Sequence, residues 1–237
     1  MMTYPRLEEI MTIETMTLNE LESRKSLCSS TVPLSSVVLE MKKRIEDYDQ
    51  YAFVDFANCF LGGGSLHGAG AQEEILFSII PECCLAMAFC HTMTNEQAIA
   101  IKGCTRIGSY TGYGHSFEYT GPFQASNPPA PIEVIGIDAN DVGGQYQFTE
   151  SVVLRDINKA KAGFMLIGDE MKGVSSGKWG CGVFGGDPVL KCIQQWISAS
   201  LVGKEVGMEE SCKSCESCKS CNLREIGIMG WMGILMQ

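Results

Sequence analysis

The sequence predicts an α/β protein in which a mixed central sheet is layered with helices. Short apolar runs typical of strands alternate along the chain with segments whose apolar positions recur at helical spacing. The 237 residues are 45% hydrophobic, which is enough for one sizeable core. We therefore expect one core domain over residues 33–203, preceded by a poorly determined N-terminal arm over residues 1–32 and followed by a Cys-rich tail over residues 204–237.

The first strands are expected at residues 36–47 and 51–61. Their sequences, SVVLEMKKRIED and YAFVDFANCFL, are separated by DYDQ, a cluster of residues that form tight turns. A helix is expected over residues 72–80, and a second helical piece after Pro81, because proline fits the first turn of a helix.

Two more strands are expected later in the core. Residues 96–103 (EQAIAIKG) place isoleucine at alternate positions before a glycine, and residues 131–139 (PIEVIGIDA) repeat that pattern. Between them, residues 109–131 are aromatic and then rich in proline, so we expect this segment to be mostly loop.

Two longer helices complete the expected core. Residues 150–166 carry apolar side chains at helical spacing, and so do residues 187–201. Asp187 is a favourable N-cap for the second of these helices, and Pro188 suits its first helical position.

Charge and the lack of long apolar runs narrow the class of protein. A net charge of −10 argues against a protein that coats DNA or RNA through a basic surface, because Lys and Arg must neutralise the phosphates in such complexes. No apolar run is long enough for a membrane span, and charges enter the N-terminal segment too early for a signal peptide. We expect an intracellular protein, nuclear or cytoplasmic, with no membrane contact and no direct DNA binding.

The 12 cysteines are expected to be reduced thiols, because no export signal accompanies them. Four of them repeat at every third position of the tail, at Cys212, Cys215, Cys218 and Cys221. Such a run could ligate zinc or iron, but zinc sites generally separate two CxxC pairs. A disordered, low-complexity tail is the favoured interpretation, and neither a metal site nor a cofactor is expected.

The stretch most typical of a functional site is FVDFANCFLGGGSLHGAGAQEEILF, residues 53–77. A strand that leads through a glycine loop into a helix can hold phosphate, because backbone N–H groups lie beside the positive end of the helix. The same arrangement can also be a simple turn, and the loop carries none of the common nucleotide-binding motifs. A second glycine loop, WGCGVFGGDP at residues 179–188, follows a segment that we expect to be too polar for a strand. The two loops could close on one diphosphate.

Two carboxylates, Glu73 and Glu74, follow the first glycine loop. Carboxylates in the first turn of a helix are often only capping groups. A ligand held by the loop would nevertheless lie within their reach, and a glutamate whose pKa rises by roughly two units can act as a general acid near neutral pH. Tyr110 and Tyr113 could stack on a base or a ribose, or could only anchor their loop onto the core.

Taken together, these segments resemble the poly(ADP-ribose) glycohydrolase family. The family signature is three glycines, a short linker and Gln-Glu-Glu, which GGG at residues 62–64, SLHGAGA, and QEE at residues 72–74 match. VDFAN, YTGY, IDA, INKAKAGF and WGCGVFGGDP occur in the order that the family has, so the resemblance covers roughly residues 33–200.

This resemblance implies a three-layer, macrodomain-like fold that binds ADP-ribose and hydrolyses the ribose–ribose O-glycosidic bonds of poly(ADP-ribose). It implies that Glu74 is the catalytic acid and base and that Glu73 orients the ribose. The implied partners are the polymer, ADP-ribose as product, and poly(ADP-ribosyl)ated proteins of the DNA damage response. The implied substrate-binding residues are Asp55, Asn58, Gly62, Gly63, Gly64, Gln72, Tyr113, Gly182, Phe184 and Gly185.

Two departures from the family leave an alternative open. Lys178 precedes the tryptophan of the second glycine loop, where members usually have asparagine. Members also carry a helical domain before the macrodomain and an aromatic-bearing strand after the GGDP helix, and neither end of this chain resembles them. A core shortened in this way could bind ADP-ribose without turnover, so the alternative is a catalytically impaired ADP-ribose binding module.

Overall fold

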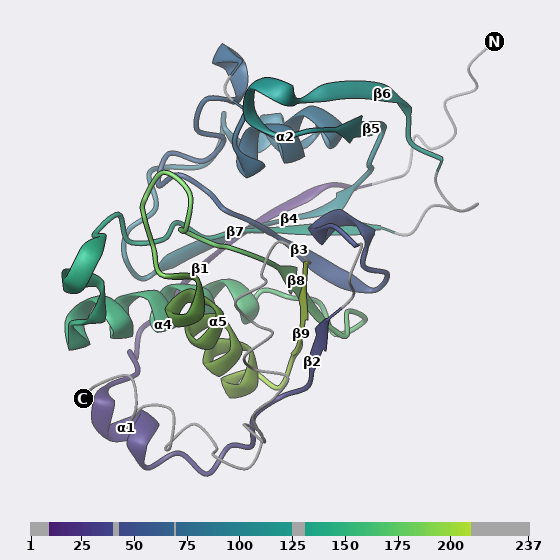
Figure 1. Ribbon diagram of the computed structural model, residues 1–237. Coiled ribbons are helices and arrows are strands. Elements are labelled where there is room, and N and C mark those ends of the chain that lie inside the picture. The colour runs from purple at the N-terminus through teal and green to yellow at the C-terminus, as the bar shows by residue number, and fades with distance from the viewer. Residues whose placement is uncertain (1–9, 40–42, 69, 125–130, 210–237) are drawn as a thin grey trace.

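The fold is a three-layer arrangement around a mixed seven-stranded sheet (Figure 1). This computed structural model describes residues 10–39, 43–68, 70–124 and 131–209. The strands of the large sheet lie in the order β1-β4-β7-β3-β8-β9-β2. Their bounds are β1 (Thr12–Thr17), β2 (Val37–Leu39), β3 (Tyr51–Asp55), β4 (Gln97–Cys104), β7 (Ile132–Gly136), β8 (Gly173–Ser176) and β9 (Glu205–Met208).

Helices cover both faces of this sheet. α4 and α5 lie on one face, and α2 lies on the other face beside the β5–β6 hairpin (Figure 1). The bounds of the helices and of the hairpin strands are α1 (Arg24–Cys28), α2 (Gln72–Ile79), α3 (Cys83–Ala86), α4 (Glu150–Phe164), α5 (Pro188–Leu201), β5 (Gly108–Thr111) and β6 (Glu118–Pro122). The 3₁₀ turns are η1 (Ile45–Asp47), η2 (Ser65–His67), η3 (Gly114–Ser116) and η4 (Gly144–Phe148).

The strand directions bring the ends of several strands to one edge of the sheet. β4 runs antiparallel to its neighbours β1 and β7, whereas β7, β3, β8, β9 and β2 pair in parallel. Because ligands of open α/β sheets bind at the carboxyl ends of such strands, this edge is the natural place for a site. The α/β class with a mixed sheet is therefore confirmed.

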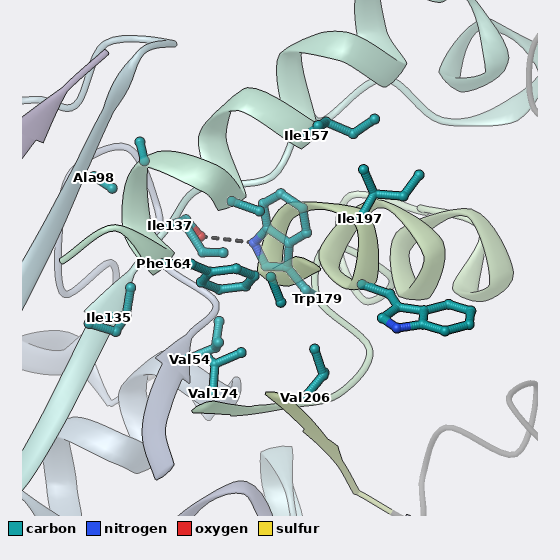
Figure 2. Packing of buried hydrophobic residues seen from close by; sticks show 14 of the residues in the cluster. Val54, Ala98, Ile135, Ile137, Ile157, Phe164, Val174, Trp179, Ile197 and Val206 are labelled. Atoms are coloured by element: carbon teal, nitrogen blue, oxygen red, sulfur yellow. Dashed lines mark hydrogen bonds between the residues drawn. The ribbon is translucent and has the colours of Figure 1, made fainter. Parts of the chain in front are cut away.

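Side chains of β3 alternate between the two cores. Ala52 and Val54 are buried with side chains of α4 and α5, whereas Phe53 is buried with side chains of α2. Figure 2 shows the first of these cores, in which Val54 lies near Val174 of β8. The same alternation directs Asp55 toward the α2 face, where the glycine loop and its two glutamates also lie.

The strand expected over residues 36–47 is shorter than predicted. Among the described residues of this segment, β2 is the strand, and the end of the segment forms η1. This turn is held by Arg106, whose Nη1 donates to the Glu46 carbonyl at 3.1 Å and to Asp47 Oδ1 at 2.9 Å. Arg106 is distant in the sequence, so apolar periodicity carries no sign of it. The helical piece expected after Pro81 is likewise reduced, to the single turn α3.

The loop expected over residues 109–131 contains the β5–β6 hairpin. The two strands pair antiparallel with Tyr110 opposite Tyr119, and the register shifts after Ser109. Gly121 has a φ of 128°, which suits an irregular strand. Such irregularities disrupt the strict alternation by which a strand is found in a sequence, so the hairpin escapes prediction.

The segment before the second glycine loop is a strand, so the expectation that it is too polar for one is wrong. β8 consists of GVSS, and all of its residues are buried. Ser175 Oγ donates to the Ile45 carbonyl at 2.7 Å, and Ser176 Oγ donates to Gln195 Oε1. Buried hydroxyls with partners are common inside proteins, so a polar strand can lie within a sheet.

The sheet extends beyond the expected core at both ends. β1, from the expected arm, pairs with β4, and β9, from the expected tail, pairs with β8 and β2. These two pairings were not expected, because composition does not reveal strand pairing. The cysteine repeat at residues 212–221 lies outside the described residues. Within the described part of the chain, no helix is long and apolar enough to cross a bilayer, and no cluster of three or more His, Cys, Asp or Glu could hold a metal ion.

Candidate active site

A cleft of about 800 Å³ opens along the sheet edge where β3, β8 and β9 end. Its walls are Gly63 and Gly64 of the first glycine loop, the start of α2, residues 180–184 of the second glycine loop, η1 and the β5–β6 hairpin. The expected site residues that line it are Asn58, Gly63, Gly64, Gln72, Glu73, Glu74, Tyr113, Gly182 and Phe184. The expected residues outside its lining are Asp55, Gly62 and Gly185.

The first glycine loop holds the two glutamates through its backbone. The Gly62 N–H donates to Glu73 Oε1 at 2.5 Å, and the Gly64 N–H donates to Glu74 Oε1 at 2.9 Å. The Asn58 N–H donates to Glu73 Oε2 at 3.0 Å. The loop therefore uses these N–H groups on protein carboxylates, whereas the sequence suggested that they hold phosphate.

Glu73 and Glu74 differ in how many of their carboxylate oxygens have a hydrogen-bond partner. Both oxygens of Glu73 accept backbone N–H groups. Glu74 Oε2, in contrast, is buried without a hydrogen-bond partner in the described chain. Both side chains line the cleft. Glu74 therefore has one carboxylate oxygen that no described residue satisfies.

Asp55 is fully buried, and neither of its carboxyl oxygens has a hydrogen-bond partner among the described residues. Burial raises the pKa of Asp55 well above its usual value, and the nearby charges of Glu73 and Glu74 raise it further. Burial also raises the pKa of Glu73 to about 8, although its two backbone N–H donors act in the opposite direction. Asp55 and Glu73 therefore retain protons at neutral pH.

Gln72 ties the start of α2 to the end of β3. Its Oε1 accepts the Phe56 N–H at 2.8 Å, and its Nε2 donates to the Val54 carbonyl at 2.9 Å. The side-chain amide thus continues the hydrogen bonding of the strand past its last residue. This tie fixes the position from which Glu73 and Glu74 project into the cleft.

Gly63 is required where the loop passes the glutamates. Its φ is +45°, and a Cβ at this position would lie 2.6 Å from Glu73 Oε2 and 2.9 Å from Glu74 Oε1. Gly62 has a φ of +89°, and a Cβ there would lie 2.5 Å from Met87 Sδ. Only glycine lets the backbone come this close to the carboxylates.

A second wall of the cleft is formed by η1 and the hairpin. Arg44 Nη1 donates to the Tyr110 carbonyl at 2.8 Å, and its guanidinium lies 4.2 Å from the centre of the Tyr110 ring. Burial raises the pKa of Tyr110, and the neighbouring Glu46 adds to this shift. Tyr113 lines the cleft and is 61% exposed. Arg44 and Glu46 were not predicted as site residues, because their segment was expected to be a strand.

The second glycine loop is anchored by Trp179. The indole is fully buried, and its Nε1 donates to the Ile137 carbonyl at 2.9 Å (Figure 2). The Gly186 N–H donates to the Gly180 carbonyl at 2.9 Å, which closes the loop on itself. In the described structure, the backbone N–H groups of residues 182–184 have no acceptor, and these residues line the cleft. Such free donors can bind an anion.

Comparison with known proteins places this arrangement in context. A family model described as "Poly (ADP-ribose) glycohydrolase (PARG), Macro domain fold" matches residues 24–213. The probable poly(ADP-ribose) glycohydrolase 2 of Arabidopsis thaliana is 35% identical over 225 residues, which cover 76% of this chain and 43% of the relative. The poly(ADP-ribose) glycohydrolase 1 of Caenorhabditis elegans is 36% identical over 179 residues, which cover 68% of this chain and 23% of the relative. The chain thus spans less than half the length of these two relatives.

Two solved structures share the fold. The poly(ADP-ribose) glycohydrolase of Deinococcus radiodurans in complex with ADP-ribose matches with a TM-score of 0.52 and 15% identity, over 87% of this chain and 95% of that chain. The enzyme from Thermomonospora curvata matches with a TM-score of 0.52 and 18% identity, over 81% of this chain and 79% of that chain. With the family model, these likenesses confirm the macrodomain-like fold.

Proposed function

The chain belongs to the poly(ADP-ribose) glycohydrolase family, and from this premise we propose that it hydrolyses the ribose–ribose O-glycosidic bonds of poly(ADP-ribose) and releases ADP-ribose. The observation that carries the proposal is the pair Glu73 and Glu74, both lining the cleft and both held by N–H groups of the first glycine loop. The protein partners in this proposal are poly(ADP-ribosyl)ated proteins of the nucleus or cytoplasm.

Glu74 is the acid and base of the proposed reaction. Its Oε1 is fixed by the Gly64 N–H, and its Oε2 has no partner in the described chain. Burial raises the pKa values of its neighbours Asp55 and Glu73, so these two carboxyls hold protons near neutral pH beside Glu74. Glu74 gives a proton to the departing ribose oxygen and then accepts one from the water that attacks the oxocarbenium-like carbon.

Glu73 and Asn58 orient the reacting ribose. A carboxylate oxygen accepts more than one hydrogen bond, so Glu73 can accept ribose hydroxyls while its backbone donors remain in place. Asn58 Oδ1 accepts the Phe60 N–H at 3.0 Å, and the amide hydrogens of Asn58 have no acceptor among the described residues. Asn58 lines the cleft, so these hydrogens are available to the sugar. Asp55 affects the ribose indirectly, through its electrostatic interaction with Glu73 and Glu74.

The diphosphate of ADP-ribose binds at the second glycine loop in this proposal. Residues 182–184 supply free N–H donors, and Phe184 also lines the cleft. Tyr113, which also lines the cleft, covers the ligand from the hairpin side. A cleft of about 800 Å³ is in the range of small-ligand sites.

Incubation of the purified chain with labelled poly(ADP-ribose) tests the proposal. The unchanged chain should release ADP-ribose, and Glu74→Gln should lose roughly 10²–10⁴-fold in rate while still binding ADP-ribose. Glu82→Gln is the matched control. Glu82 also accepts a backbone N–H, that of Thr105 at 2.5 Å, but lies outside the cleft lining, so its variant should keep its rate.

The outcome separates two functions. Tight binding of ADP-ribose by the unchanged chain without any release would overturn the hydrolase and support an ADP-ribose binding module instead. Release that persists in the Glu74→Gln variant would leave the activity standing but remove Glu74 from its proposed role.

A further inference from the structure

A buried cluster of charges lies behind the second glycine loop. Asp138 pairs with Lys159 at 2.6 Å and with Arg155 at 2.5 Å, and Arg155 also pairs with Asp156 at 3.0 Å. Lys191 pairs with the other oxygen of Asp156. The side chains of all these residues are at most 13% exposed. Three cations thus face two carboxylates, so this charge cluster carries one positive charge in excess.

Lys191 is the member of the charge cluster that reaches the loop. A Cβ on Gly186 would lie 2.8 Å from Lys191 Cε, and a Cβ on Gly180 would lie 3.3 Å from it. The ammonium lies 5.2 Å from the centre of the Trp179 ring. The side chain therefore runs directly against the glycine backbone of the loop, and it does so with 1% exposure.

Lys191 and Lys159 are similarly buried but differ in their partners. Lys159 Nζ donates to two backbone carbonyls, at 2.5 Å and 2.6 Å, in addition to its pairing with Asp138. Among the described residues, the Lys191 ammonium has one acceptor, Asp156. An ammonium has three hydrogens to donate. Lys159 is therefore saturated by the protein, whereas Lys191 retains positive charge that the protein does not fully compensate.

We propose that Lys191 is a positioning residue for an anionic diphosphate bound at the second glycine loop. Its contacts with Gly180 and Gly186 hold the free N–H groups of residues 182–184 at the cleft, and its charge favours an anion there. The electrostatic attraction between a buried charge and a nearby anion is stronger than that of a surface charge, because less water lies between them. The assignment of this anion to the diphosphate of ADP-ribose rests on the proposed function, but the preference for an anion does not.

The variants Lys191→Met and Lys159→Met form a matched pair, because each removes a buried ammonium from the same charge cluster. Their binding to inorganic pyrophosphate, ADP-ribose and adenosine can be measured by calorimetry on the full chain. Lys191→Met should weaken binding of pyrophosphate and ADP-ribose by about tenfold or more, and that of adenosine by less than about twofold. Lys159→Met should leave all three within about twofold, although both variants are expected to unfold at lower urea concentration.

Equal losses of anion binding in the two variants would overturn the inference, and so would equal losses for ADP-ribose and adenosine in Lys191→Met. Failure of the unchanged chain to bind either anion would overturn it as well. If Lys191→Met does not fold, the double variant Lys191→Met with Asp156→Asn removes both charges of the pair and carries the same expectation. Pyrophosphate binding that depends on Lys191, in a chain that never hydrolyses the polymer, would support the inference and overturn only the proposed function.

Discussion

Gly64 donates its backbone N–H to Glu74 Oε1 at 2.9 Å, so the first glycine loop fixes the glutamate that lies 10 positions further along the chain. Gly62 does the same for Glu73 at 2.5 Å. The glycines and the glutamates of the family signature are therefore one hydrogen-bonded unit. A change in the loop should act on the reaction through the carboxylates.

Gly63→Ala should reduce polymer hydrolysis by at least about a hundredfold, because misplacement of a reacting group by about 1 Å can have that effect. The new Cβ would lie within 3.0 Å of both carboxylates and displace them. Gly68→Ala is the control: Gly68 also has a positive φ, +76°, but a Cβ there meets nothing within 4 Å. Rates of ADP-ribose release, with circular dichroism to verify folding, measure the effect. Equal losses of rate in both variants would mean that backbone strain, and not displacement of the carboxylates, causes the effect.

Stability should fall as pH rises through the range in which Glu73 loses its proton. The pKa of Glu73 is about 8 in the folded protein against an ordinary value of 4.5, so the folded state holds a proton that the unfolded chain releases. The favourable contribution of this protonation is complete below pH 4.5 and is lost as pH rises to about 8. Glu73→Gln is neutral at every pH, so it should gain stability relative to the unchanged chain across this range.

Urea unfolding at intervals between about pH 5 and pH 9 measures that difference. The stability gained by Glu73→Gln relative to the unchanged chain should level off above the folded-state pKa of about 8. A difference that stays constant over the whole range would contradict the raised pKa of Glu73.

Trp179→Phe should destabilise the protein by about 1–3 kcal/mol, because it leaves the buried Ile137 carbonyl without its donor. It should also weaken ADP-ribose binding, since the second glycine loop loses its anchor. Trp196→Phe removes a comparable bond, from Nε1 to the Ser35 carbonyl at 2.9 Å, away from the cleft lining. Urea unfolding and calorimetry should show destabilisation in both variants but reduced affinity only in Trp179→Phe.

Gln72→Leu should lower both stability and the rate of hydrolysis. The variant removes the two hydrogen bonds that join α2 to β3 and leaves the Phe56 N–H and the Val54 carbonyl without these partners, at a cost of about 1–3 kcal/mol. Because Gln72 precedes Glu73, the loss should also loosen the glutamates. A variant that is destabilised but keeps the full rate would show that the glycine loop alone positions them.

The helices and strands that the sequence predicted correctly are those that depend on residues close together in the chain. α5 begins as expected, because the Asp187 side chain accepts the N–H groups of Val189 and Leu190 at 3.0 Å and 2.9 Å. The start of α2 at Gln72, Glu73 and Glu74 was also predicted, since the glycine loop and the helix start are contiguous in the chain. β3 was expected because most of its residues are apolar and all are buried, but the strand ends at Asp55 and not at residue 61 as predicted.

The features that the sequence did not reveal depend on partners far along the chain. β8 is polar, and its serines are tolerated only because Ile45 and Gln195 accept their hydroxyls. Arg44 and Glu46 reach the cleft through a turn that Arg106 holds. Lys191 lies on a helix where a lysine would ordinarily face water, and its pairing with Asp156 compensates its charge in the interior.

The outer strands of the sheet set practical limits on how the chain can be trimmed for expression. A fragment of residues 33–203 would lack β1 and β9 and would leave β4 and β8 as open edges. Open edges offer unpaired N–H and C=O groups to other molecules, so such a fragment should precipitate or self-associate. A crystallisation fragment should instead start before Thr12 and end after Met208, so that both strands remain in place.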